Sequence, residues 1–83
     1  MAFYVYILYS PSKDKYYIGS CEDMDARIGQ HNSGRNKSTK YGIPWDLKKV
    51  ETYHTRSEAM QRELFIKRMK SRTFIQLAIA GER

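Results

Sequence analysis

The sequence predicts a small α/β sandwich, in which a three-stranded, hairpin-led sheet, antiparallel or mixed, is flanked by about three helices. Two apolar, tyrosine-rich runs near the N-terminus, at 3–9 and 16–19, have the composition of adjacent strands. The segments that follow have the order helix, strand, helix, helix, which favours helices packed on a sheet. With 83 residues, of which 41% are hydrophobic and 13% aromatic, the chain is expected to form a single domain over residues 1–83.

The two N-terminal runs are expected to pair as a hairpin, because the linker at 10–14 contains Pro11 and Ser12, which favour a turn. If a loop of two or four residues joins the strands without a bulge, Tyr6 and Tyr17 lie on the same face of the sheet. The same parity assigns Tyr4, Leu8 and Gly19 to the face of these tyrosines, and Val5, Ile7 and Ile18 to the opposite face. Neither face is polar, so helices are expected on both.

A first helix is expected after the hairpin. Asp23 can cap it, and it runs to about Ser33, where Gly34 is well placed to end it. At about 100° per residue, Arg27 and His31 lie one turn apart at the border of the apolar stripe. Both side chains are therefore expected to be semi-buried.

The middle of the chain is expected to form a loop and a third strand. Residues 35–44 lack periodicity and are rich in turn-forming and basic side chains, which predicts a basic surface loop. Leu47, Val50 and Tyr53 then alternate imperfectly with polar residues. This pattern predicts a strand at 47–53.

Two helices are expected at the C-terminal end. Thr55-Arg56-Ser57-Glu58 matches a capping box, which predicts a helix from Thr55 to about Met69. Ser71 is expected to cap a short final helix through Ala80, closed by Gly81. Its apolar side chains are expected to pack in the core, with a homodimer interface as the alternative use. These side chains are Phe74, Ile75, Leu77 and Ile79.

The formal net charge of +6 is unevenly distributed. Residues 1–25 contain two basic and four acidic side chains, whereas residues 26–83 contain thirteen basic and five acidic ones. Such a field favours polyanions and makes their binding salt dependent through counterion release. Solvated Lys and Arg side chains that maintain solubility are the alternative explanation.

Several classes of protein are disfavoured by the sequence. There is no cationic stretch before an apolar core, as in a signal peptide, and no apolar run approaches the length of a membrane span. The single cysteine, Cys21, cannot form an internal disulfide and has no cluster of other metal ligands near it. We therefore expect a cytoplasmic protein without a membrane partner.

Glu63 is the most anomalous side chain of the helix predicted at 55–69. It falls on the apolar arc between Ala59 and Ile66, where an unpaired buried carboxylate is unfavourable. It must meet a cation, a metal ion, hydrogen-bond donors or water at the rim. Two interpretations remain open, a structural ion pair with Lys or Arg and a ligand for a hard metal ion.

Each of the other polar candidates also has an ordinary structural explanation. A strand tyrosine can pack in the core, Arg27 can be solvated, and His31 can be a hydrogen-bonded histidine near a helix end. Together with two phenols on one face and an inward carboxylate, however, they supply the parts for phosphodiester hydrolysis. These parts are a proton acceptor, a phosphate clamp and an electrophile.

At this point the sequence resembles a known family. Tyr4-Val5-Tyr6 and Tyr17-Ile18-Gly19, followed by Arg27, His31 and Glu63, resemble the GIY-YIG nuclease superfamily over nearly the whole chain. The length is similar to that of its small bacterial stand-alone members. Two positions differ from the family pattern, because Tyr4 replaces the first glycine of the name motif and no Asn follows Glu63.

The resemblance implies roles for individual side chains. Glu63 would bind one divalent metal ion, with Mg²⁺ as the first expectation and Mn²⁺ as the alternative. Arg27 and His31 would contact the scissile phosphate or orient the nucleophile. Tyr6 or Tyr17 would help to activate the attacking water. Ser20 and Lys40 would assist phosphate binding, and the basic loop adds Arg35 and Lys37 as nucleic-acid contacts.

The resulting expectation is a metal-dependent endonuclease that hydrolyses DNA phosphodiester bonds, selects its substrate by structure, and acts in DNA repair or processing. The first alternative is a nucleic-acid-binding module with the same fold and weak or no activity. The second is a protein-interaction scaffold that needs neither metal nor nucleic acid, and it predicts no salt-sensitive binding of DNA.

Overall fold

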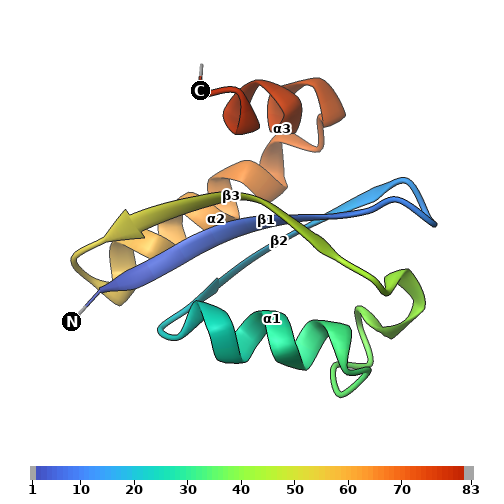
Figure 1. Ribbon diagram of the computed structural model, residues 1–83. Helices are drawn as coiled ribbons and strands as arrows, with labels where there is room; N and C mark the ends of the chain where they lie inside the picture. Colours follow the sequence, from blue (N-terminus) through green and yellow to red (C-terminus); the bar gives the residue numbers. More distant parts are fainter. Residues whose placement is uncertain (1, 82–83) are drawn as a thin grey trace.

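The chain folds into a three-stranded antiparallel sheet with helices on both faces, as the sequence predicts (Figure 1). The computed structural model describes residues 2–81. Its elements in chain order are β1 (Phe3–Ser10), β2 (Lys15–Cys21), α1 (Met24–Asn32), the 3₁₀ helix η1 (Lys40–Gly42), β3 (Asp46–Tyr53), α2 (Arg56–Met69) and α3 (Arg72–Ile79).

β1 is the central strand, because the order in the sheet is β2-β1-β3. In the hairpin Ser10 faces Lys15, so the loop has the predicted even length, and Tyr6 faces Gly19. Tyr17 lies two residues before Gly19 on β2 and therefore points to the same face as Tyr6. The parity prediction is confirmed. A register shift occurs in the pairing of β1 with β3, next to Ile7, and leaves the hairpin regular.

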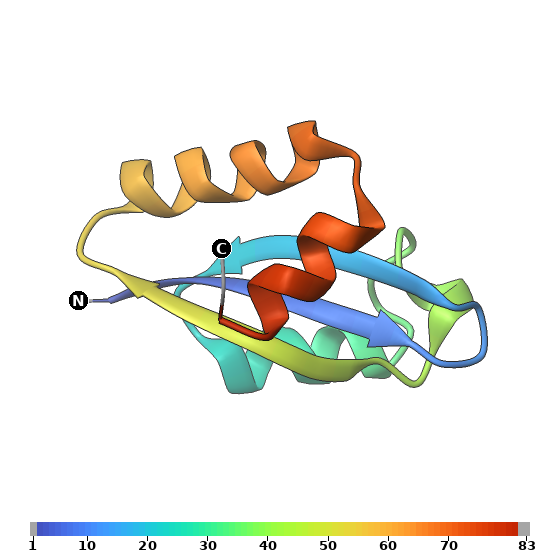
Figure 2. The same ribbon diagram turned by 90° about the horizontal axis from the view of Figure 1, so that it is seen from above.

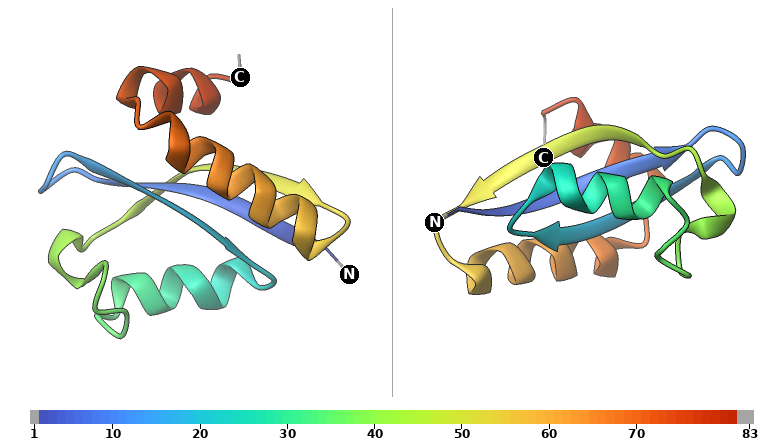
Figure 3. Two further views of the ribbon diagram at one scale, coloured as in Figure 1. Left: turned by 180° about the vertical axis from the view of Figure 1, so that it is seen from behind. Right: turned by 60° about the horizontal axis from the view of Figure 1, so that its bottom comes forward.

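The sheet separates two apolar clusters (Figures 1 and 2). On one face α2 and α3 cover a cluster formed by Val5, Ile7, Ile18, Ala59, Ile66 and Ala78. On the other face, next to α1, the cluster consists of Tyr6, Leu8, Cys21 and Trp45. Figure 3 shows that α1 and α2 flank the end of β2 from opposite faces of the sheet. Odd and even positions of β1 therefore serve two different environments.

The helices begin where the local sequence predicts. Asp23 Oδ1 accepts a hydrogen bond from the Ala26 amide at 3.1 Å at the start of α1. The capping box of Thr55 and Glu58 is complete at the start of α2. Ser71 Oγ accepts from an amide of the first turn of α3. These caps satisfy amides that have no partner within the helix, and so fix where each helix starts.

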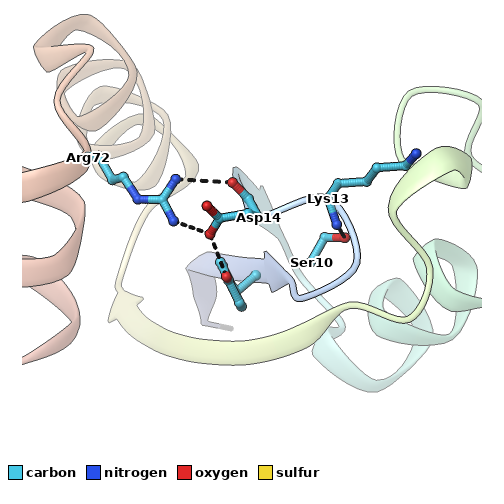
Figure 4. Close-up of polar contacts among 5 residues, drawn as sticks. Ser10, Lys13, Asp14 and Arg72 are labelled. Carbon is cyan, nitrogen blue, oxygen red and sulfur yellow. Dashed lines mark hydrogen bonds and ion pairs between the residues drawn. The ribbon is translucent and has the colours of Figure 1, made fainter.

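The hairpin turn and the start of α3 are held together by Asp14 and Arg72 (Figure 4). Asp14 accepts hydrogen bonds from the Arg72 guanidinium and from the Tyr9 hydroxyl, and Arg72 also donates to the Asp14 carbonyl at 3.0 Å. The Arg72 guanidinium lies 5.2 Å from the centre of the Tyr16 ring. These contacts fix α3, and Phe74 packs against the core as predicted.

Within residues 2–81, no helix has the length and apolar composition that a membrane crossing requires.

Candidate active site

A cleft of about 480 Å³ opens where β2 leads into α1, between α1 and α2. The end of β2 contributes Ser20, α1 contributes Arg27, and α2 contributes Glu63. Three of the residues selected from the sequence therefore line one cleft although they are far apart in the chain. Tyr6, Tyr17 and His31 are not among the described residues that line it.

Glu63 is held by two side chains. Its side chain is 21% exposed, and its carboxylate accepts a hydrogen bond from Ser20 Oγ at 2.6 Å through Oε1 and pairs with Lys67 Nζ at 2.5 Å through Oε2. The structure thus contains the ion pair that was one of the two interpretations of Glu63. Ser20, expected to assist phosphate binding, donates its hydroxyl proton to this carboxylate.

The donor set at Glu63 suits a hard divalent cation with few protein ligands. The Lys67 ammonium already acts as a stand-in cation on the carboxylate. Within residues 2–81, no three His, Cys, Asp or Glu side chains are grouped so that they could hold a metal ion. Glu22 and Asp23 line the same cleft, but Glu22 pairs with Arg56 and Asp23 caps α1. One carboxylate completed by water and substrate oxygen atoms is the usual arrangement for Mg²⁺.

Arg27 supplies the positive charge of the cleft that is not neutralised internally. The side chain is half-buried, and among residues 2–81 its guanidinium forms no ion pair. A guanidinium in this state can form two parallel hydrogen bonds to a phosphate. The Arg27 guanidinium is therefore available to an anionic group that enters the cleft.

His31 is completely buried and forms the middle of a hydrogen-bonded chain. Its Nε2 lies 2.9 Å from the Tyr6 hydroxyl, and its Nδ1 lies 2.7 Å from Thr39 Oγ1. Thr39 Oγ1 also lies within hydrogen-bond distance, 3.5 Å, of the Asn36 carbonyl. One arrangement gives every proton an acceptor, with Tyr6 donating to Nε2, Nδ1–H donating to Thr39, and Thr39 donating to Asn36.

The surroundings of these hydrogen-bonded side chains determine the protonation states of Tyr6 and His31. Burial, with a smaller contribution from Arg27, lowers the pKa of His31. Burial, with a contribution from the Tyr17 phenol, raises the pKa of Tyr6 far above its ordinary value. At neutral pH, Tyr6 is therefore a protonated donor and His31 a neutral acceptor. The expectation of a semi-buried His31 was wrong, because Tyr6 and Thr39 enclose the ring from both sides.

The Tyr17 ring packs beside Tyr6 and His31 but forms no hydrogen bond with either of them. Its centre is 6.4 Å from that of Tyr6 and 5.0 Å from that of His31. Within residues 2–81 its hydroxyl has no hydrogen-bond partner. Gly19, next to it on this face, is required by close packing, because a Cβ there would collide with the ring and hydroxyl of Tyr6. The glycine of Tyr17-Ile18-Gly19 thus makes room for the first tyrosine.

The basic loop is an ordered surface segment. Arg35, Lys37 and Lys40 are exposed on it, as predicted. The Asn32 side chain bonds both the amide of Trp45, at 2.6 Å, and its carbonyl, at 3.2 Å, and so joins the two ends of the loop.

Trp45 also places Thr39. Its Nε1–H donates to the Thr39 carbonyl at 2.7 Å, which leaves the Thr39 hydroxyl for His31. Sequence reasoning missed Thr39, because a contact between a loop threonine and a buried ring leaves no periodic pattern in the sequence.

Known proteins match this chain over most of its length. A family model described as the GIY-YIG catalytic domain matches residues 2–75. A UPF0213 protein of Bacillus cereus is 37% identical over 73 residues, which cover 87% of this chain and 76% of the relative. A UPF0213 protein of Halobacterium salinarum is 36% identical over 67 residues, 80% of this chain and 86% of the relative.

A solved structure agrees with these matches. The solution NMR structure of a UPF0213 protein from Bacillus halodurans has a TM-score of 0.62 and 31% identity, and the match covers 99% of this chain and 86% of that chain. The resemblance drawn from the two tyrosine motifs, Arg27, His31 and Glu63 is confirmed at the level of the family. This chain therefore belongs to the GIY-YIG catalytic-domain family, which is a family of endonucleases.

Proposed function

We propose that this protein is a metal-dependent endonuclease that hydrolyses DNA phosphodiester bonds, selects its substrate by structure, and acts in DNA repair or processing. The observation that carries the proposal is the cleft in which the unpaired guanidinium of Arg27 and the carboxylate of Glu63 are both exposed to a substrate. Family membership supports the reaction class.

Glu63 and Arg27 would have different roles at the scissile phosphate. Glu63 would hold one divalent cation, Mg²⁺ in the first place, and Ser20 would orient its carboxylate. A cation in this position supplies Lewis-acid stabilisation of charge that develops on the phosphate oxygen atoms. Arg27 would clamp the same phosphate and neutralise its additional charge in the transition state.

The hydrogen-bonded chain would take up the proton of the attacking water. Tyr6 rests as a donor, so it can act as a base only if its proton first moves to His31 Nε2, against the pKa shifts that burial imposes on both groups. The phenolate then accepts a proton from water as the new P–O bond forms, and the leaving oxygen is protonated by solvent. Thr39 would hold His31 in the tautomer that keeps Nε2 open to Tyr6. Arg35, Lys37 and Lys40 would contact phosphates outside the cleft.

Three observations favour a second candidate function, a nucleic-acid-binding module with weak or no catalytic activity. Tyr6 is only 1% exposed, both ring nitrogens of His31 are hydrogen-bonded, and Lys67 occupies the carboxylate of Glu63. In such a module these groups form a satisfied polar core and the basic surface alone binds the ligand.

Cleavage of branched and flapped DNA with Mg²⁺ separates the two candidates. We expect cleavage by the wild-type protein, loss of cleavage in Glu63→Ala, and retention of DNA binding by that variant. Glu22→Ala is the matched control, because it removes another carboxylate from the same cleft. A wild-type protein that binds these substrates and cuts none of them would instead favour the binding module.

A further inference from the structure

Lys67 stands between the candidate metal ligand and a second groove. Its ammonium pairs with Glu63 Oε2, and its side chain is 47% exposed. The same side chain lines a groove of about 440 Å³ between the hairpin, the end of α2 and the start of α3. The pair of Asp14 and Arg72, drawn in Figure 4, lines this groove.

This second groove is strongly basic. Lys15, Lys67, Lys70 and Arg72 line it, and Asp14 is the one acidic side chain among its described lining residues. Asp14 is already neutralised by Arg72, whereas Lys15 and Lys70 form no ion pair within residues 2–81. Ammonium groups along a groove are suited to the phosphate backbone of a nucleic acid, where each contact releases counterions.

The position of Lys67 creates a competition for Glu63. A divalent cation and an ammonium group cannot both remain within bonding distance of one carboxylate without strong mutual repulsion. An exposed i,i+4 ion pair is weak, and the lysine stem is flexible, so the displacement of Lys67 costs little. The displaced ammonium has the basic groove within reach, because its own side chain forms part of the lining.

We propose that Lys67 is a cation-responsive phosphate ligand, which neutralises Glu63 while no cation is bound and contacts a backbone phosphate of the substrate in the second groove once a divalent cation takes the carboxylate. The proposal rests on the assignment of Glu63 as the cation ligand. It couples the two binding events, so that the cation increases DNA affinity and DNA increases cation affinity by the same factor.

The test measures binding of a fluorescein-labelled flapped DNA in EDTA and in Ca²⁺, a hard cation with the same preference for oxygen ligands. In EDTA, Lys67→Met should weaken binding no more than Arg68→Met, which removes the same charge from α2 outside the grooves. In Ca²⁺, Lys67→Met should cost about tenfold in affinity, as expected for one charge-assisted contact. The cost of Arg68→Met should not change between the two solutions.

Glu63→Gln tests the same coupling without a cation. In this background Lys67 has lost its ion pair, so Lys67→Met should cost about tenfold in EDTA as well. Manganese binding followed by electron paramagnetic resonance adds a measurement without DNA, in which Lys67→Met should bind Mn²⁺ more tightly and Glu63→Gln should not bind it.

No measurement in this design depends on cleavage, so an inactive protein can still support the role of Lys67. Equal costs of Lys67→Met in EDTA, in Ca²⁺ and in the Glu63→Gln background would overturn the proposal while leaving a nuclease function intact. Failure of every variant to bind DNA would overturn the proposed function together with it.

Discussion

The Thr39 hydroxyl lies 2.7 Å from Nδ1 of His31, so a residue of the basic surface loop sets the hydrogen bonding of a completely buried ring. The loop and the interior are therefore not independent. In the arrangement that gives every proton an acceptor, Thr39 accepts a hydrogen bond from Nδ1–H, and Tyr6 donates one to Nε2.

Two substitutions of Thr39 distinguish the contribution of its hydroxyl group from that of its side-chain shape. Thr39→Val is expected to destabilise the protein by about 1–3 kcal/mol, because Nδ1–H is left buried without an acceptor. Thr39→Ser should restore most of this loss. Urea denaturation measures the change, and ¹⁵N chemical shifts of His31 report the tautomer. If His31 of the wild-type protein carried its proton on Nε2, the donor and acceptor roles assigned to Tyr6, His31 and Thr39 would be wrong.

Gly19 and Gly29 are expected to respond to alanine in opposite directions. Gly19→Ala should destabilise by about 1–3 kcal/mol, because the added Cβ overlaps the Tyr6 phenol. Gly29→Ala on α1 should stabilise by about 0.5–1 kcal/mol, because nothing lies within 4 Å of its added Cβ and alanine favours the helix. Denaturant titrations of both variants provide the comparison. A neutral Gly19→Ala would mean that Tyr6 does not need this space.

The stability of the protein should fall as the pH decreases below about 6.5, the ordinary pKa of histidine. Burial, followed by the charge of Arg27, lowers the pKa of His31 in the folded state, so the unfolded state binds the proton first. Each pH unit between the two pKa values costs up to about 1.4 kcal/mol. Below the folded-state pKa this contribution is fully lost.

Urea denaturation at pH 7.5 and at successively lower pH measures this loss. His31→Gln should remove the loss of stability that begins near pH 6.5, whereas His54→Gln, at an exposed position, should keep it. Equal pH dependence in wild type and His31→Gln would show that another group is responsible.

The two tyrosines should differ in their effect on cleavage. Tyr6→Phe is expected to lower the single-turnover rate by about 10²–10⁴-fold, the usual contribution of a general base. Tyr17→Phe should stay within about tenfold, because its hydroxyl is not bonded to His31. Unfolding curves of both variants show whether a loss of cleavage results only from a loss of stability. A larger defect in Tyr17→Phe would transfer the role of the base to that residue.

The secondary structure could be predicted because its signals are local. Asp23, Thr55 and Ser71 each cap the helix that follows them, and an even loop length was sufficient to place Tyr6 and Tyr17 on one face. These features depend on residues close together in the chain or on strand parity, both of which can be read without a structure.

The interior of the candidate site could not be predicted in the same way. The burial of His31 depends on the path of the loop, which Trp45 fixes through contacts that the sequence does not specify. The ion-pair partner of Glu63 is easier to predict from the sequence. Lys67 follows Glu63 by four residues, and an i,i+4 pair of opposite charges is a recognisable helical pattern. The position of Glu63 on the apolar arc of the predicted helix identified an anomalous carboxylate, but it did not show which cation neutralises that carboxylate.

The central position of β1 has a consequence for errors in folding. Side chains alternate along the strand between the core under α2 and α3 and the side that carries Tyr6. A slip of one residue against β2 or β3 would therefore send Tyr6 into the aliphatic core and Val5 or Ile7 into its place. A one-residue slip therefore cannot disturb the site and leave the core intact. Destabilised variants should accordingly lose functional molecules in proportion to unfolded ones, with no folded but inert population between them.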